Sequence, residues 1–241
     1  MRYGIFSDVH SNLEAFQSVL EAYKDKNIDK YYCLGDVVGY SANPKECIGL
    51  IQDNKIETIA GNHDWALSGR FSMDYFNDYA KEALLWTQKH TSPEEKVSLD
   101  KLEISKQEKD FVLVHGTLYN PEEFHYMLDP YAIRRTFELM NCNLCFVGHT
   151  HCAEVFIDDK QQICYSGESL INLEPNKKYI INVGSVGQPR DRDPRASFCI
   201  YDSDKKEVEF FRIDYDMEST HRKVLNSGLP TFLANRILEG R

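Results

Sequence analysis

The first sixty residues alternate between short apolar segments and amphipathic ones. Three apolar segments are predicted strands: residues 3–7, 30–34 and 57–60. Apolar residues recur at helical spacing over 13–23, and Ser11 with Glu14 predicts a capping box at the start of that helix. Pro44 can open a second helix, which ends near Gln52. This βαβαβ order predicts parallel strands in a sheet covered by helices.

The segment from about residue 65 to residue 100 has a helical pattern and is rich in aromatic residues. These are Trp65, Phe71, Tyr75, Phe76, Tyr79 and Trp86. Two interpretations stay open: the rings form a helical core or a cap packed on the body, or they form a wall on which bases stack. The dipeptide Ser92-Pro93 interrupts the helical pattern.

Strands return after residue 110 and dominate the last third of the chain. The predicted strands are 111–114, 144–147, 154–157, 162–165, 180–183, 197–201 and 208–213, with helices at 131–140 and 232–238. The third and fourth of these strands are expected to form a hairpin. Since the chain shows no repeat, linker or low-complexity tract, we expect a single domain over 1–241. The 65–100 segment would be a helical insertion or cap on it.

Five predicted strands end in the same way, with Asp, Asn or His beside glycine or another small residue. The endings are Asp8-Val9-His10, Gly35-Asp36, Gly61-Asn62-His63-Asp64, His115-Gly116 and Gly148-His149-Thr150-His151. The carboxyl ends of strands in α/β sheets form the ligand crevice, so we expect these side chains to gather at one edge. Four residues that follow His115-Gly116 are expected near the pocket mouth: Tyr119, Phe124, His125 and Tyr126.

Such a gathering of side chains points to metal ions. Three carboxylates would repel one another unless cations compensate them. Mixed nitrogen and oxygen ligands without cysteine suit manganese, iron or zinc. The ligands are too numerous for one ion but fit two ions that share a carboxylate. Paired metals about 3.5–4 Å apart suit in-line displacement at phosphorus.

The ordered series D-x-H, G-D, G-N-H-D, H-G and G-H-x-H, which runs from Asp8 to His151, resembles the calcineurin-like metallophosphoesterase superfamily. The later segment 182–190, N-V-G-S-V-G-Q-P-R, is similar to the G-S-V-G-Q-P-R segment of its small bacterial and archaeal phosphodiesterase branch. The resemblance therefore covers most of the chain. It implies an α/β fold: a four-layer α/β/β/α sandwich of two mixed β-sheets flanked by helices.

The resemblance also implies roles for individual residues. One metal ion would be held by Asp8, His10, Asp36 and His151. The other would be held by Asp36, Asn62, His115 and His149, so that Asp36 bridges the two. A hydroxide between the ions would attack phosphorus, and His63 would protonate the leaving oxygen or stabilise charge there. Arg190 could bind a phosphate oxygen. We expect manganese first, with iron, zinc or nickel as alternatives.

Two departures from the family pattern bear on the substrate. Gly39-Tyr40 stands where the protein phosphatases of the superfamily have an Asp-Arg pair, so a phosphoprotein substrate is not expected. The usual N-P-G-S turn becomes 182–185, N-V-G-S, which weakens any inference about that turn. We therefore expect small phosphodiesters or nucleotides as substrates, dinucleoside polyphosphates among them.

Charge and composition narrow the function further. With 28 basic and 38 acidic residues the net charge is −10, which argues against a protein that coats long nucleic acid. A nuclease for single strands stays as an alternative, and a non-catalytic scaffold with the same fold is a second one. No segment suits a membrane span, the first residues turn polar too early for a signal peptide, and the cysteine number, seven, is odd. These features predict free thiols and a cytoplasmic location, and an oligomer is compatible with them.

Overall fold

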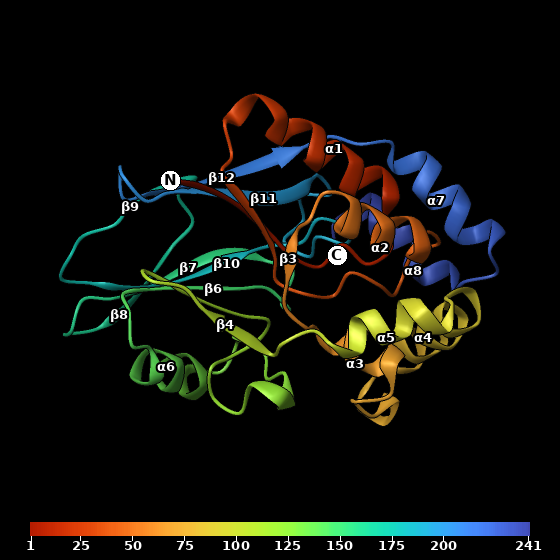
Figure 1. Ribbon diagram of the computed structural model, residues 1–241, viewed down its shortest axis with the longest axis horizontal. Coiled ribbons are helices and arrows are strands. Elements are labelled where there is room, and N and C mark those ends of the chain that lie inside the picture. The colour runs from red at the N-terminus through yellow and green to blue at the C-terminus, as the bar shows by residue number, and fades with distance from the viewer.

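Two six-stranded sheets lie face to face in the computed structural model, which describes all 241 residues (Figure 1). The first sheet has the order β3-β2-β1-β11-β12-β9, with β1 (Arg2–Phe6), β2 (Lys30–Cys33), β3 (Glu57–Thr58), β9 (Leu170–Asn172), β11 (Ala196–Asp202) and β12 (Glu207–Ile213). The second has the order β4-β5-β6-β10-β7-β8, with β4 (Ser105–Gln107), β5 (Val112–Val114), β6 (Leu144–Val147), β7 (Ala153–Asp158), β8 (Ile163–Ser166) and β10 (Lys178–Val183). Both sheets mix parallel and antiparallel pairs.

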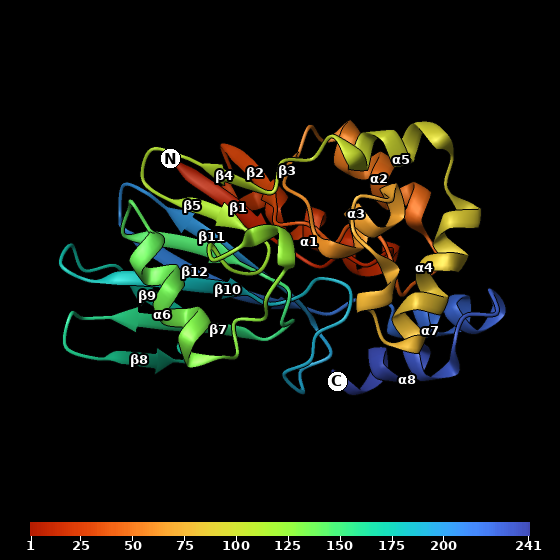
Figure 2. The ribbon, with the colours of Figure 1, turned by 90° about the horizontal axis from the view of Figure 1, so that it is seen from below.

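Helices cover both outer faces and one end of the sheets. The α-helices are α1 (Leu13–Tyr23), α2 (Pro44–Asp53), α3 (Asn62–Ser68), α4 (Asp78–His90), α5 (Pro93–Asp100), α6 (Pro130–Leu139), α7 (Met217–Asn226) and α8 (Thr231–Glu239). Three short 3₁₀ helices complete the set: η1 (Lys24–Lys26), η2 (Met73–Tyr75) and η3 (Pro121–Glu123). Helix α1 lies over the first sheet and α6 over the second, while α3, α4, α5, α7 and α8 gather at one end (Figures 1 and 2). The expected four-layer sandwich is confirmed.

Three apolar layers hold the sheets and helices together. Ile5 of β1 and Phe146 of β6 belong to the buried cluster between the two sheets. Phe6, the next residue of β1, points the other way and packs with Phe16 of α1, because successive side chains alternate across a strand. Phe137 of α6 closes the outer face of the second sheet. The central strands are therefore covered on both faces, which explains why β5 and β6 consist of buried apolar residues.

The site is positioned by six parallel strands whose carboxyl ends meet. In the first sheet β1, β2 and β3 run parallel, and in the second β5, β6 and β10 do. The backbone N–H of His149, after β6, donates to the Asp8 carboxylate, after β1, at 3.0 Å. This hydrogen bond joins the carboxyl ends of the two parallel sets into one edge.

Several local expectations need correction. Asn12, not Ser11, caps α1, and its side chain accepts from the N–H of Ala15 at 3.1 Å. Ser11 cannot cap because its backbone is left-handed, with φ +56°, and its hydroxyl has no partner. The predicted strand 57–60 shortens to the two residues of β3. Ile59 forms only an isolated bridge with Glu103, and α3 begins after Gly61. The pattern also missed β4, β9 and α7; the two strands are short and mostly polar or exposed, which hides any alternation.

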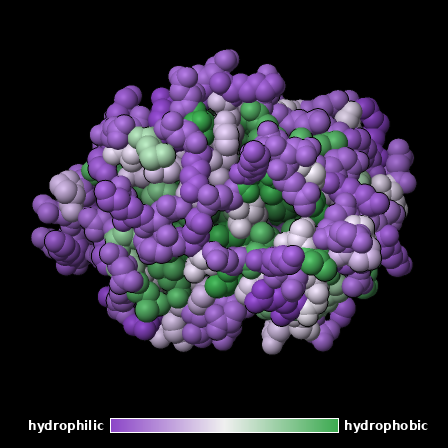
Figure 3. All heavy atoms as spheres, in the orientation of Figure 1, coloured by the Kyte–Doolittle hydropathy of each residue, from purple (hydrophilic) through white to green (hydrophobic).

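The visible surface is mostly polar. Figure 3 shows a mostly hydrophilic face, with hydrophobic atoms gathered mainly toward its middle. All seven cysteines are free thiols, as expected. None of the helices combines the length and the apolar character that a bilayer span requires.

Candidate metal centre and substrate cavity

The residues predicted as metal ligands are buried at the joined strand ends. Potential ligand atoms of aspartate and histidine side chains form three groups. Within each group these atoms lie no more than 4.8 Å apart. The groups are Asp8, His10 and His151; His10, Asp36 and His63; and Asp36, His115 and His149. Asp36 belongs to two of the groups, and its carboxylate lies between them.

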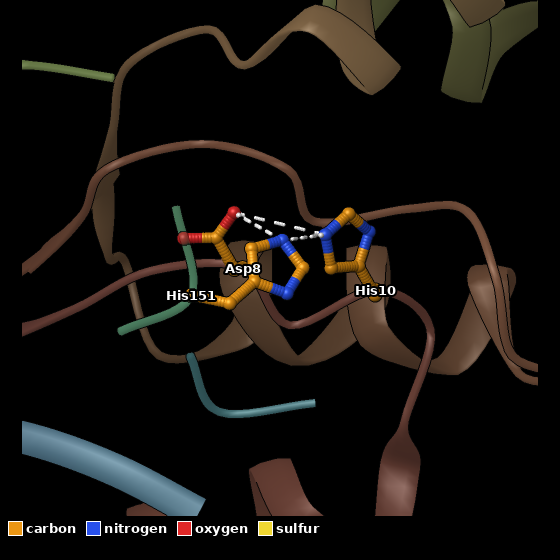
Figure 4. A group of neighbouring side chains, drawn as sticks. All are labelled: Asp8, His10 and His151. Atoms are coloured by element: carbon orange, nitrogen blue, oxygen red, sulfur yellow. Dashed lines mark hydrogen bonds and ion pairs between the residues drawn. The ribbon is translucent and has the colours of Figure 1, made fainter. Parts of the chain in front are cut away.

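The first group converges on one oxygen of Asp8 (Figure 4). Nε2 of His151 lies 3.2 Å from Asp8 Oδ1, and Nε2 of His10 lies 3.6 Å from it. The two imidazole nitrogens are 3.0 Å apart. Three ligand atoms from two different sheets therefore surround one small volume.

The third group has the same form around Asp36. Nε2 of His115 lies 3.3 Å from Asp36 Oδ2 and 3.1 Å from Nδ1 of His149. The same Asp36 oxygen is 3.6 Å from Nε2 of His10, in the first group. One carboxylate thus reaches the ligand atoms on both sides of the centre.

Backbone carbonyls orient three of the four histidines. Nδ1 of His10 lies 3.0 Å from the Val38 carbonyl, and Nδ1 of His115 lies 2.7 Å from that of Leu34. Nδ1 of His151 lies 2.6 Å from the carbonyl of Gln188. Since a carbonyl only accepts, each Nδ1 must donate, so Nε2 of the neutral ring points its lone pair into the centre. Metal-binding histidines are held in this manner. His115 must lose a proton to take the neutral form, because against the effect of burial Asp36 and Asp8 raise its pKa to about 9.

Unsatisfied oxygens in the centre fit a cation. Asp8 Oδ1 and Asn62 Oδ1 are buried and have no hydrogen-bond partner. A buried polar atom without a partner costs free energy, and a bound cation would remove that cost. The donor set of carboxylate, amide and imidazole, with no thiolate, suits manganese, iron, zinc or nickel.

The backbone is strained where the candidate ligands lie. Five of them have left-handed φ angles: Asp8 (+56°), His10 (+48°), Asp36 (+54°), His149 (+65°) and His151 (+63°). For residues other than glycine this conformation costs roughly 1–2 kcal/mol and is concentrated at functional sites. The left-handed turns at His149 and His151 place these two side chains in different groups, although only one residue separates them.

Two glycines allow the strand ends to approach one another. A Cβ on Gly61 would lie 2.0 Å from Oδ1 of Asp36. A Cβ on Gly148 would lie 2.1 Å from Ser7 Oγ and 2.6 Å from Asp8 Oδ2. No side chain fits at either position while the carboxylates keep their places.

The electrostatics keep the carboxylates ionised. Burial alone would raise their pKa values, but His151 and His10 hold the pKa of Asp8 well below its usual range, and His115 and His63 do the same for the pKa of Asp36. Burial lowers the pKa of His149 to about 3 and that of His151 to about 3, so both rings are neutral at pH 7. Neutral imidazole and ionised carboxylate are the forms that bind metals.

Asp64 supports the centre from behind, a role that the sequence argument did not assign. Its Oδ2 accepts from the N–H of Asp36 at 2.8 Å and from that of Gly61 at 3.0 Å, and its Oδ1 accepts from the N–H of Val37 at 3.0 Å. Burial, together with the charge of Asp36, raises the pKa of Asp64 to about 7. Its place in the G-N-H-D motif was the available signal. Asp64 therefore ties the loop after β2 to the start of α3.

We expect Asp64→Ala to lower the free energy of unfolding by about 1–3 kcal/mol, because it leaves buried N–H groups without an acceptor. Urea unfolding of the metal-free protein measures this change. The control is Asp53→Ala at the exposed end of α2, which should change stability by no more than about 0.5 kcal/mol. Equal midpoints for the two variants would show that the Asp64 hydrogen bonds add nothing to stability.

Arg190 lies beside the first group. Its backbone N–H donates to the carbonyl of His151 at 3.1 Å, and its guanidinium donates to Gln188 Oε1 at 2.9 Å and to the Tyr40 hydroxyl at 3.3 Å. Its Nε is buried and has no partner. Tyr40, the residue that departs from the protein-phosphatase pattern, packs between Arg190 and the ring of His63. The guanidinium retains an unused donor next to the centre.

A cavity of about 780 Å³ opens onto the other side of the centre. Asn62, His63 and His149 line its floor, and the segment from α3 to α4 lines one wall. The opposite wall is the segment that contains η3 and continues to Tyr126, including Phe124 and His125 as expected. Tyr119 is absent from the lining and packs with Tyr131. Figure 2 shows the light-green η3 segment across from the orange α3 segment.

His63 is buried at the junction between the metal centre and the cavity. Its N–H donates to Asp36 Oδ1 at 2.9 Å, and its ring meets the edge of Phe76, with centroids 4.9 Å apart. Nδ1 has no hydrogen-bond partner, and burial lowers the pKa of His63 well below its usual value. The ring belongs to the second group, so the structure brings it as close to Asp36 as the residues predicted to be ligands.

Comparison with known proteins gives consistent results. A model described as a calcineurin-like phosphoesterase superfamily domain matches residues 1–206. The chain is 39% identical to the uncharacterized protein MJ0912 of Methanocaldococcus jannaschii, over 98% of this chain and 97% of that protein. It superposes on a metallophosphoesterase from Sphaerobacter thermophilus with a TM-score of 0.87, at 35% identity, covering 100% of this chain and 99% of the other. The hypothetical protein PH1004 from Pyrococcus horikoshii shares the fold, with a TM-score of 0.80 at 20% identity, over 100% and 98% of the two chains.

Proposed function

Because the chain belongs to the calcineurin-like phosphoesterase superfamily, we propose that it is a hydrolase of small phosphodiesters or nucleotides that uses two divalent metal ions. The observation that carries the proposal is the position of Asp36 Oδ2, which lies 3.6 Å from Nε2 of His10 in the first group and 3.3 Å from Nε2 of His115 in the third. The relative from Sphaerobacter thermophilus, which is called a metallophosphoesterase, supports the same chemistry. Dinucleoside polyphosphates are among the candidate substrates.

In this proposal the two ions share Asp36. One would be held by Asp8, His10, Asp36 and His151, the other by Asp36, Asn62, His115 and His149. When bound, two such ions supply positive charge against the phosphoryl oxygens and lower the pKa of water at the site. The chain itself supplies the fixed geometry, through the carbonyls that orient His10, His115 and His151.

We assign the proton transfer to His63. The ring lines the cavity that would take the leaving group, and it lies beside Asp36 and the other candidate ligands. A phosphoryl anion beside the ring favours its protonated form, because an opposite charge within a few ångströms stabilises the imidazolium. His63 would give that proton to the leaving oxygen as the bond to phosphorus breaks.

We propose that Arg190 binds a phosphate beyond the one that reacts. Arg190→Ala should raise KM about 10-fold or more for a dinucleoside polyphosphate, since a hydrogen bond to a charged group contributes about 1.5–3 kcal/mol. KM for a diester with neutral arms should change less, and kcat should be nearly constant because this contact is made equally in the ground and transition states.

Steady-state kinetics with both substrates measure the effect of Arg190→Ala. Arg192→Ala is the matched control, because Arg192 is exposed on the same loop. An equal rise of KM for the two substrates would instead mean that Arg190 acts through its structural contacts with Tyr40 and Gln188.

A substrate screen tests the proposed function. The metal-loaded protein is assayed on bis-p-nitrophenyl phosphate, cyclic nucleotides, dinucleoside polyphosphates, single-stranded oligonucleotides and a phosphoserine peptide. We expect turnover of small diesters or nucleotides and none of the peptide. Preference for oligonucleotides with a steep salt dependence would favour a nuclease instead. No turnover of any ester with metals bound would favour a non-catalytic scaffold.

A further inference from the structure

The cavity beside the centre is larger than a phosphate needs, and six of its 16 lining residues are Phe or Tyr. Its volume of about 780 Å³ lies in the range of small-molecule sites. Its walls hold Phe71, Tyr75, Phe76, Phe124 and Tyr126. If the protein cleaves phosphodiesters as proposed, one arm of the substrate must lie here, because the floor contains His63 and His149 of the centre.

Two tyrosines that line this cavity are exposed, and each of them also stacks on a neighbouring ring of the protein. Tyr75 is 79% exposed and stacks on Phe71, with ring centroids 5.2 Å apart and planes 28° apart. Tyr126 is 47% exposed and stacks on His149, with centroids 3.9 Å apart and planes 18° apart. A ring fixed on one side and open on the other is suited to stacking with a planar ligand.

The charges around the cavity disfavour a second phosphate in it. Glu122 and Glu123 line the same wall, and Glu123 pairs with His125 at 2.8 Å. Arg70 lies over the ring of Trp65, 4.0 Å from its centroid, and donates to the carbonyl of Asp100 at 2.8 Å. The basic side chains in the lining are therefore engaged, and the acidic ones repel an anion. The arm that fits is uncharged and planar.

We infer that this cavity binds the planar aromatic arm of the phosphodiester substrate, a nucleobase or an aryl ring, by stacking on Tyr126 and Tyr75. The inference rests on the proposed function and adds to it the class of substrate. The two interpretations of the aromatic 65–100 segment then apply to different residues. Trp65 is buried against Phe124 and belongs to the packed cap, whereas Tyr75 lines the cavity and is available for stacking.

Tyr79 offers a matched control on the neighbouring helix. It is 46% exposed, almost the same as Tyr126, but it stacks on Phe232 of α8 with centroids 4.6 Å apart and does not line the cavity. Tyr79→Ala therefore removes a ring of similar exposure and leaves the proposed subsite unchanged.

Calorimetric titration of the manganese-loaded protein tests the inference with three probes: AMP, phenyl phosphate and ribose 5-phosphate. We expect AMP or phenyl phosphate to bind about 5- to 150-fold more tightly than ribose 5-phosphate, the range found for one base stacked on an aromatic side chain. Tighter binding of AMP identifies a nucleobase site, and tighter binding of phenyl phosphate identifies an aryl site. Tyr75→Ala and Tyr126→Ala should each reduce this preference, whereas Tyr75→Phe, Tyr126→Phe and Tyr79→Ala should keep it.

Tyr126 touches a candidate ligand, so manganese per chain is measured for each variant. A loss of preference in Tyr126→Ala that comes with lost manganese, while Tyr75→Ala keeps both, overturns the role of Tyr126. Equal affinities of the three probes in the unaltered protein, together with turnover of bis-p-nitrophenyl phosphate, overturn the inference and leave the proposed function intact. Absence of both probe binding and diester turnover is the failure of the proposed function itself, and the inference fails with it.

Discussion

Asp36→Asn is expected to reduce the bound metal from two ions per chain to one or none and to lower diester turnover by about 10³-fold or more. Asp36 is buried, and its Oδ2 lies within 3.3 Å of His115 Nε2 and 3.6 Å of His10 Nε2, one from each ligand group. Asparagine keeps the shape but replaces one oxygen by an amide NH₂, which cannot bind a cation. The size of the effect follows from the several kcal/mol that metal ions contribute to charge stabilisation.

Elemental analysis of purified Asp36→Asn, with turnover in the same sample, measures this prediction. The comparison variant is His151→Ala, whose side chain belongs to the first group only and should cost a single ion. His149→Ala should cost the other ion, which anomalous diffraction would locate. Two tightly held ions in Asp36→Asn, or loss of the same ion in both histidine variants, would show that the proposed sharing is wrong.

His63→Asn is expected to slow cleavage of diesters with poor leaving groups by about 10²–10⁴-fold, the usual contribution of a general acid. An alkoxide such as a ribose oxygen needs a proton as it leaves, whereas p-nitrophenolate leaves readily without one. The same variant should therefore lose much less activity on bis-p-nitrophenyl phosphate. Both metals should remain, because His63 is assigned to the leaving group and not to an ion.

Parallel kinetics on bis-p-nitrophenyl phosphate and on a dinucleoside monophosphate measure this difference, with metal content determined for each sample. His90→Asn is a suitable control, since His90 is exposed and stacks on Trp86. A deficit of the same size on both substrates would exclude His63 as the acid and favour a role in stabilising charge on the phosphoryl oxygens. Loss of an ion would identify His63 as a ligand, in line with its place near Asp36.

The sequence predicted most of the strands, and it predicted that Asp8, Asp36 and His115 lie close together. Both predictions follow from short-range patterns. Apolar runs that end in Asp, Asn or His are visible in the sequence, and parallel strands bring their carboxyl ends to one edge. The cap of α1 was misplaced for the opposite reason: Ser11 has the right chemistry, but a left-handed backbone turns it away. Propensity cannot detect strain that only the tertiary structure imposes.

The supporting residues and the cavity depend on contacts that no sequence spacing encodes. Asp64 reaches the N–H of Asp36 across 28 positions of the chain. Tyr75 and Phe76 are neighbours in sequence, yet Tyr75 is exposed while Phe76 packs against His63. Which ring faces a ligand is set by the packing of η2 and α4 against each other and of α4 against α2 and α3, so the sequence alone left both interpretations of the aromatic segment open.

The most direct test of the two-metal account is a titration of the metal-free protein with Mn²⁺, in which bound manganese and turnover of bis-p-nitrophenyl phosphate are followed together. The account predicts that binding saturates at two ions per chain and that turnover reaches its plateau only with the second ion. Saturation at one ion with full turnover, or full turnover with no bound metal, would contradict it.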